Sequence, residues 1–331
     1  MNARQTFVAA LACIVFGACG PRQAAESLPP PVPLSLALPC DLVPAAGVDW
    51  LIEARPREVA EIADLIPAIG LVVSEARFNA FAKAHGGVDV RSIERACVSR
   101  HGTTLLAIAR TPLDPARVQA AFTERSTRLP VRFIDVQNPP VVRLSGEVAG
   151  ERQEMVTFDR ELVAVEYGPQ GPLRASEAFA QGKLRRASPA LRSHVFAPAS
   201  TILGDAPVRA FIAGPFEGDT AKGLGGLLRA TTSVGVSATS AGPGARIAVR
   251  LVLTGAWGKD GPAAAERFGA AVNVISESSL GRLFGLQHPV EGPRVHATDD
   301  ALILDATLDA NALARGIHAA LDADVTDMMS K

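Results

Sequence analysis

The length, composition and charge of the chain exclude several classes of protein. With 331 residues, 48% of them hydrophobic and 20% charged, the chain is long enough for two ordinary domains and apolar enough to fold. Its 33 Lys and Arg residues balance 34 Asp and Glu, so it lacks the basic surplus typical of nucleic-acid-binding proteins. Aromatic residues make up only 5% of the chain, too few for a surface on which bases or sugars stack.

The first 18 residues are typical of an export signal. Arg4 supplies a positive charge, and an apolar run from Thr6 to Ala18 follows it. A helix that spans a bilayer needs about 20 apolar residues, so this run is too short for a permanent membrane anchor. We therefore expect residues 1–18 to be a signal peptide.

The segment Phe16-Gly17-Ala18-Cys19 resembles the lipobox of bacterial lipoproteins, although that family usually carries Leu at the place of Phe16. The resemblance implies cleavage before Cys19, lipidation of the Cys19 sulfur and attachment to a membrane through this lipid anchor. The specific resemblance covers residues 1–19, and the rest of the chain is similar only in general terms to uncharacterised lipoproteins of Gram-negative envelopes.

The residue after the modified cysteine bears on the destination of the protein. In the lipoprotein resemblance, Gly20 instead of Asp implies sorting to the outer membrane, facing the periplasm or the cell surface. The alternative is ordinary signal-peptide cleavage near Ala18, Ala24 or Ala25, which would give a soluble periplasmic protein.

Residues 19–40 are expected to be a spacer that follows the lipidated cysteine. The run Pro29-Pro30-Pro31 favours an extended, semi-rigid chain. Cys40 and Cys97 are the two cysteines that remain beyond Cys19, and in an oxidising compartment we expect them to form a disulfide. The alternative is two separate buried thiols.

Hydrophobic periodicity and turn residues predict an α+β fold of antiparallel sheets with packed helices. The first lobe is predicted over residues 41–170 and a helix with a connector over 171–204. Strands are expected at 49–54, 96–99, 104–109, 131–136, 141–144, 155–158 and 162–167, and helices at 57–83, from Asp114-Pro115 onward and at 173–186.

The second lobe, residues 205–331, is predicted to repeat a similar order of elements. Strands are expected at 208–213, 235–240, 246–254, 294–298 and 301–308. Helices are expected at 220–231, from Pro262 past Ile275 with a second piece through Phe284, and after Asp309. The shared order suggests a duplication. A common α+β plan without common ancestry is the alternative.

The sequence carries no recognisable pattern for catalysis, cofactor binding or metal binding. The histidines lack metal-ligand spacing, and they are His85, His101, His194, His288, His296 and His318. The segment 235–239 lacks the last glycine of a serine nucleophile elbow, and 222–226 lacks the order of a phosphate-binding loop. We therefore predict no catalytic, cofactor-binding or metal-ligating residue.

These observations favour a non-enzymatic, lipid-anchored envelope protein with a binding or assembly role and an envelope protein as partner. One alternative is a periplasmic carrier of an apolar ligand, which would require a large aliphatic cavity. Another is a hydrolase whose serine, histidine and carboxylate meet only in the fold, with His101 and His296 as the histidines to inspect.

Overall fold

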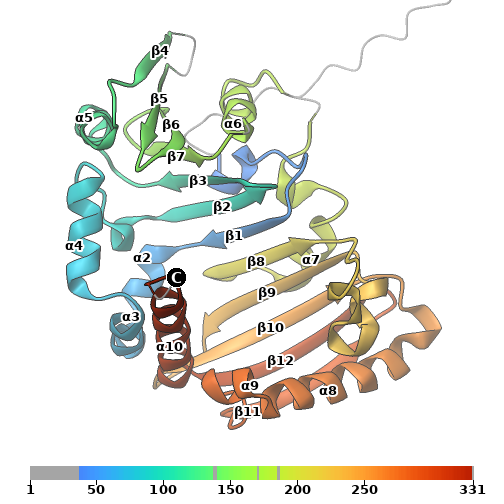
Figure 1. The fold of residues 1–331 in the computed structure, drawn as a ribbon. Coiled ribbons are helices and arrows are strands. Elements are labelled where there is room, and N and C mark those ends of the chain that lie inside the picture. Colours follow the sequence, from blue (N-terminus) through green and yellow to red (C-terminus); the bar gives the residue numbers. More distant parts are fainter. Residues whose placement is uncertain (1–36, 137–139, 170, 185–186, 330–331) are drawn as a thin grey trace, which may run out of the picture. The chain divides into compact units, whose positions relative to one another are not determined.

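A single antiparallel sheet of 12 strands forms the frame of the protein in a computed structural model (Figure 1). The structure describes residues 37–136, 140–169, 171–184 and 187–329. The strand order is β11-β12-β10-β9-β8-β1-β2-β3-β7-β6-β5-β4. The strands are β1 (Trp50–Ala54), β2 (Arg95–His101), β3 (Thr104–Arg110), β4 (Val131–Asp135), β5 (Val141–Val148), β6 (Glu151–Thr157), β7 (Leu162–Tyr167), β8 (Val208–Ala213), β9 (Ser233–Ser240), β10 (Arg246–Thr254), β11 (Glu291–Ala297) and β12 (Ala301–Asp309).

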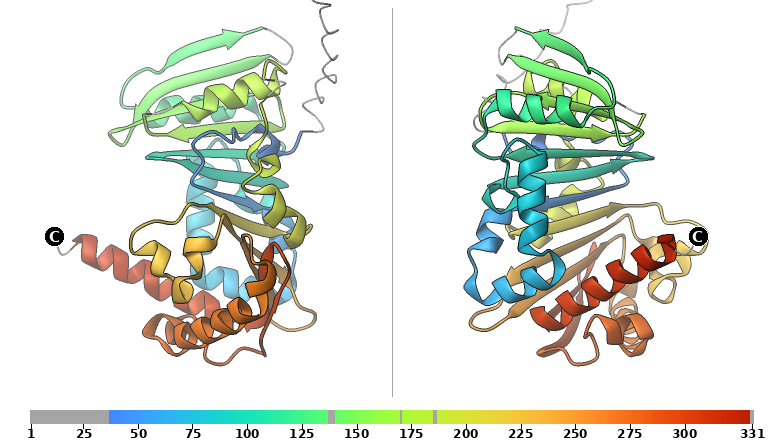
Figure 2. Two further views of the ribbon diagram at one scale, coloured as in Figure 1. Left: turned by 90° about the vertical axis from the view of Figure 1, so that its right-hand side faces the viewer. Right: turned by 60° about the vertical axis from the view of Figure 1, so that its left-hand side comes forward.

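Helices pack on both faces of this sheet (Figure 2). The α-helices are α2 (Pro56–Ala60), α3 (Ile66–Val72), α4 (Glu75–Ala84), α5 (Pro115–Arg125), α6 (Pro172–Ala180), α7 (Ala197–Leu203), α8 (Gly261–Glu277), α9 (Ser279–Leu283) and α10 (Ala310–Met329). The short 3-10 helices are η2 (Pro39–Leu42), η3 (Ala63–Leu65), η4 (Val90–Ser92), η5 (Ala190–Arg192), η6 (Thr220–Lys222), η7 (Leu224–Ala230) and η8 (Gly258–Asp260).

The α+β class and the antiparallel arrangement predicted from the sequence are confirmed. Every predicted strand is present, and in strands such as β3 alternating residues give the strand a buried side. The edge strands β4 and β11 are mostly exposed. The helix after Asp114 begins as expected, with the Asp114 carboxylate accepting the Ala116 and Arg117 N–H groups. Asp309 caps α10 in a similar way, by accepting the Ala312 N–H at 2.7 Å.

Three predicted helices are wrong in detail. The helix expected at 173–186 is α6, which ends at Ala180 because Gly182 has a φ angle of +66°. The helix expected at 57–83 is three α-helices, α2, α3 and α4, with the 3-10 helix η3 between the first two. Pro67 lies in the first turn of α3, and Ser74 caps a new helix, α4. The helix expected at 220–231 is the pair of 3-10 helices η6 and η7, because Gly225 and Gly226 have φ angles of +69° and +84°, which no α-helix contains.

One face of the sheet, which we call the connector face, is covered by η2, α6, η5 and α7. Leu51, Leu106 and Phe211 of this face are buried against Leu173 of α6 and Phe196 beside α7. Gly235 of β9 permits the close approach of α7, since a Cβ at this position would lie 3.0 Å from the Leu203 side chain. The connector face therefore holds the largest core cluster among the described residues.

The opposite face, which we call the α8 face, is covered in separate patches. Phe122 of α5 packs on Leu144 and Met155 in the first half of the chain. Phe268 of α8 packs on Leu253 and other residues of the second half, while α3 and α10 cover the sheet near residue 247. Between these patches the centre of the α8 face stays open, and Ile212 of β8 is 47% exposed.

The two halves of the chain share one sheet because β1 pairs with both β2 and β8. Leu51 lies opposite Ser99 on one side and opposite Phe211 on the other. The sequence predicted strands in each half but not this pairing. Whether the halves arose by duplication stays a prediction.

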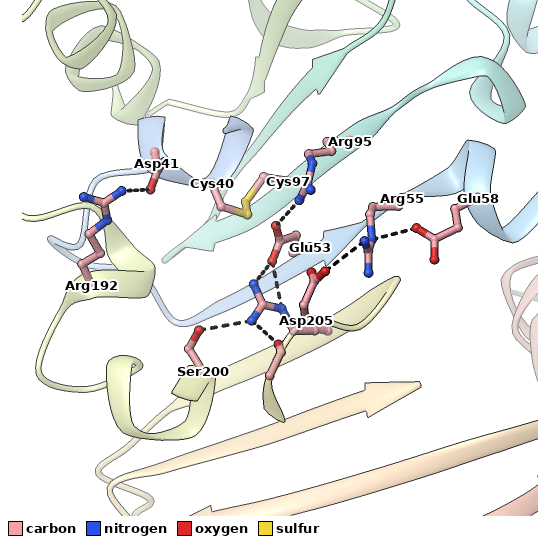
Figure 3. A network of polar contacts seen from close by, with 12 residues as sticks. Cys40, Asp41, Glu53, Arg55, Glu58, Arg95, Cys97, Arg192, Ser200 and Asp205 are labelled. Carbon is pink, nitrogen blue, oxygen red and sulfur yellow. Dashed lines mark hydrogen bonds and ion pairs between the residues drawn. A yellow bond between two sulfur atoms is a disulfide. The ribbon is translucent and has the colours of Figure 1, made fainter. Parts of the chain in front are cut away.

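A buried ion-pair network lies at the β1–β8 junction on the connector face (Figure 3). The Glu53 carboxylate of β1 accepts hydrogen bonds from the Arg209 guanidinium of β8, and Arg95 of β2 lies 3.7 Å from its other oxygen. Arg209 also donates to the Gly204 carbonyl at 2.7 Å and to Ser200. Glu53 is only 5% exposed, so these partners must compensate its buried negative charge for the loss of water.

We predict that Glu53→Ala destabilises the protein by about 3 kcal/mol, because it leaves the Arg209 charge without its main partner in a buried site. Asp305→Ala is the matched control, since the Asp305–Arg250 pair has side chains 38% and 43% exposed and its loss should cost at most about 1 kcal/mol. Urea unfolding of the two variants measures the difference. Equal losses would show that the junction does not depend on Glu53.

Candidate functional site

An apolar cavity of about 430 Å³ lies between α8 and the sheet, and we call it the α8 cavity. Its floor is formed by alternate residues of β9, β10 and β12, which all point to the α8 face. Its roof is formed by the second half of α8 and by the chain between α9 and β11. The aliphatic lining residues are Leu224, Val236, Val249, Leu251, Val272, Ile275, Leu286, Leu304, Ala306 and Leu308, together with Pro289 and Pro293.

The cavity exists because α8 fills the space above the sheet along only part of its length. In its first half, Ala264 and Phe268 are fully buried with Trp257 against Leu253 and Leu302. In its second half, the side chains facing the sheet are the smaller Val272 and Ile275. These do not fill the space above Leu251 and Leu304, so an apolar space remains under the helix.

The chemistry of the lining suits a hydrocarbon ligand. Among the described residues, the polar side chains of the lining are Asn273, Ser276 and Gln287, and no charged side chain belongs to it. Volumes of roughly 300 to 1,000 Å³ with mostly apolar walls are typical of small-molecule sites. A water-filled cavity with such walls would be unfavourable, since water there would find few hydrogen-bond partners.

A second hollow, of about 340 Å³, lies on the connector face of the same strands, and its lining is polar. Arg250 donates to Asp305 through two nitrogens, at 2.7 and 3.2 Å, and Ser237 and Thr307 flank this pair. The charges in its floor are therefore paired within the protein. The second half of the sheet thus presents an apolar hollow on one face and a polar hollow on the other.

A group of acidic residues is buried beneath α6. Glu166 of β7 lies directly opposite Glu154 of β6, and both are under 4% exposed. Glu166 accepts the Leu173 N–H at 2.8 Å, whereas its Oε1 atom has no partner among the described residues. Glu154 accepts from Arg152 and Ser145, and Glu177 of α6 pairs with Arg143.

The two opposed carboxylates of this group have different protonation behaviour. Burial, together with the charge of Glu154, raises the pKa of Glu166 to about 7. Burial alone would also raise the pKa of Glu154, but hydrogen bonds from Arg152 and Ser145 lower it. Glu166 therefore holds its proton at mildly acidic pH while Glu154 is ionised.

The disulfide predicted between Cys40 and Cys97 is confirmed, with Cα atoms 5.2 Å apart (Figure 3). It joins η2 to β2 and closes a loop with a sequence separation of 57 residues. Arg192 donates to Asp41 nearby, at 3.1 Å. The predicted lipidation site, Cys19, lies outside the described residues.

His101, one of the two histidines considered for a hydrolase, forms part of a buried structural contact. Its Nδ1 atom lies 3.2 Å from the Ala46 carbonyl, so Nδ1 carries the proton and Nε2 accepts from the Ser99 hydroxyl at 3.1 Å. Burial lowers the pKa of His101. Among the described residues no carboxylate is hydrogen-bonded to His101, although the charge of Asp49 acts on it. Ser99 is fully buried, so a substrate could not reach it.

The remaining sequence-predicted features do not come together in one site. His296 lies on the exposed side of β11, far in the sheet order from His101 on β2. Over the described ranges, no group of three or more His, Cys, Asp or Glu side chains could hold a metal ion. In the same ranges no single helix is long and apolar enough to cross a bilayer, while the bent pair 63–72 and 75–84 meets those criteria only when taken together.

Comparison with known proteins identifies a related fold but no family. No family model and no curated protein matches the chain. Crystal form IV of the protein TP0453 is similar to it, with 12% sequence identity, a TM-score of 0.51, and coverage of 86% of this chain and 98% of that one. Crystal form I of TP0453 gives 11% identity and a TM-score of 0.48 over the same shares. At this identity the likeness shows the fold alone.

We predict that Glu166→Gln makes the stability of the protein less dependent on pH. The pKa of Glu166 is raised in the folded state, so the folded protein binds more protons than the unfolded chain and loses stability as pH rises from about 4.5 to about 7. The glutamine can still accept the Leu173 N–H but carries no charge.

Thermal or urea unfolding at about pH 5 and about pH 8 measures this effect. The wild type should lose more stability between the two pH values than Glu166→Gln does. Glu151→Gln, at the exposed start of β6, is the control and should behave like the wild type. If Glu166→Gln loses as much stability between the two pH values as the wild type does, the raised pKa of Glu166 is contradicted.

Proposed function

We propose that this protein is a lipid-anchored, non-enzymatic protein of the bacterial cell envelope that binds an apolar ligand in the α8 cavity. The observation that carries this proposal is the cavity itself, with about 430 Å³ of space, aliphatic walls and no charged side chain in its lining. The cavity favours a binding role over an assembly role. The proposal therefore combines the lipid-anchored envelope protein predicted from the sequence with the alternative of a carrier for an apolar ligand.

The described residues give less support to the hydrolase alternative. Its best histidine, His101, is buried, bonds to a carbonyl instead of a carboxylate, and contacts a serine that is fully buried. The α8 cavity contains Ser276 but neither a histidine nor an acidic residue in its lining. General-base activation of a nucleophile would need at least one such group within hydrogen-bond reach.

The envelope location rests on the amino-terminal sequence and on the disulfide. The signal-like residues 1–18 and the lipobox-like segment ending in Cys19 support export and lipid anchoring. The Cys40–Cys97 disulfide fits an oxidising compartment outside the cytoplasm. An anchored protein with an apolar cavity would sit close to the lipids from which its ligand is drawn.

A duplication of the two halves is supported by their strand order. In the first half, β1, β2 and β3 are neighbours and β7 and β6 return beside β3; in the second, β8, β9 and β10 are neighbours and β12 and β11 return beside β10. A helix precedes the returning strands in each half, α5 in one and α8 in the other.

We predict that Ala306→Phe abolishes ligand binding. Ala306 points to the α8 face with Leu304 and Leu308, so a phenyl ring at this position would occupy the cavity. Ala248→Phe is the matched control, because Ala248 lies on the neighbouring strand and lines the polar hollow on the opposite face. Both proteins are purified from Gram-negative membranes, extracted with organic solvent, and the lipids released are quantified by mass spectrometry.

The wild type and Ala248→Phe should release a stoichiometric apolar molecule, and Ala306→Phe should release much less. Thermal unfolding checks that each variant is folded; if Ala306→Phe is not, Ile275→Trp tests the same cavity from its rim, where Ile275 is 40% exposed. Equal release from all the folded variants, or none from the wild type, would contradict the proposal.

A further inference from the structure

A second apolar hollow of about 460 Å³ lies on the outer side of α8, between this helix and η7, and we call it the η7 groove. It is lined by Leu224, Gly225, Arg267, Ala270, Ala271, Val274 and Ile275. Leu224 and Ile275 also line the α8 cavity. The two hollows therefore share a wall, and this wall consists of two side chains.

The backbone of this wall is in an unusual conformation. Leu224 has a φ of +51°, a region that bulky residues rarely adopt, and Gly225 and Gly226 continue in the same region. A Cβ at Gly225 would lie 4.0 Å from that of Ala271, so the segment runs close to α8. Strained residues of this kind are concentrated at ligand sites, where a small backbone change alters access.

Charge distinguishes the two hollows. The α8 cavity has no charged residue in its lining, whereas the η7 groove has one, Arg267, whose side chain is exposed on α8. A guanidinium at the end of an apolar path matches an alkyl chain that ends in a carboxylate, with which Arg forms two parallel hydrogen bonds. A single cation matches a monocarboxylate better than a phosphate ester, whose sites usually supply several donors.

We propose that the two hollows bind one molecule, a single-chain fatty acid, with its alkyl chain in the α8 cavity and its carboxylate at Arg267. The chain passes between Leu224 and Ile275, the two residues that both hollows share. This inference rests on the proposed function, to which it adds the class of ligand and its orientation.

The test compares a charged and an uncharged ligand of equal chain length in titration calorimetry on the full mature protein. Dodecanoate and 1-dodecanol are titrated at about pH 8, where the carboxylate is ionised. Arg267→Gln should weaken dodecanoate binding by about fivefold or more and leave 1-dodecanol binding within about twofold. Arg315→Gln, an exposed cation on α10 that lines neither hollow, is the control and should change neither affinity.

Two results would overturn the inference, and they differ in what they say about the proposed function. If both ligands bind the wild type and Arg267→Gln weakens neither, or weakens both equally, the carboxylate is not at Arg267 although the cavity binds alkyl chains. If the wild type binds neither ligand, the proposed function fails as well. A larger loss for dodecanoate than for 1-dodecanol, absent in Arg315→Gln, supports the inference.

Discussion

The pairing of β1 with β8 is the constraint on which the rest of this structure depends. It joins strands far apart in the chain into one sheet, and it removes the two open edges that separate half-sheets would present. The Glu53–Arg209 ion pair lies directly across this junction, where the two strands are in register. Since Glu53 is buried, a shifted register would separate its charge from Arg209, so the pair favours one alignment of the strands.

The continuous sheet divides the protein into two chemically different faces. The connector face carries the disulfide, the Glu53 network, the buried acids below α6 and the polar hollow at Arg250. The α8 face carries three separate apolar clusters and the α8 cavity. The floor of this cavity is formed by β9, β10 and β12, which are hydrogen-bonded to one another. Because paired strands are rigid, the floor cannot move towards α8 to fill the empty space.

Local features of the sequence predicted much of the fold. Alternation identified strands such as Leu162–Tyr167, and Asp114-Pro115 identified the start of a helix, because both signals depend on neighbouring residues. The β1–β8 pairing could not be predicted, since it depends on contacts between residues more than 150 apart. Similarly, the sequence predicted a helix through Val272 and Ile275, but a helical pattern does not show whether the space opposite is filled. The glycines after Leu224 interrupt the helix that the sequence predicted at 220–231, and this break, like the place of Gly225 in the η7 groove, is visible only in the structure.

The most direct test of this account is the mass of the protein purified from Gram-negative membranes, measured under native and denaturing conditions. The account predicts a denatured mass equal to a chain that begins at Cys19 with attached acyl groups, which rises by two hydrogens when the Cys40–Cys97 disulfide is reduced. It predicts a native mass that is larger by one apolar ligand. Equal native and denatured masses, for an unmodified chain that begins after Ala18, would contradict both the anchor and the bound ligand.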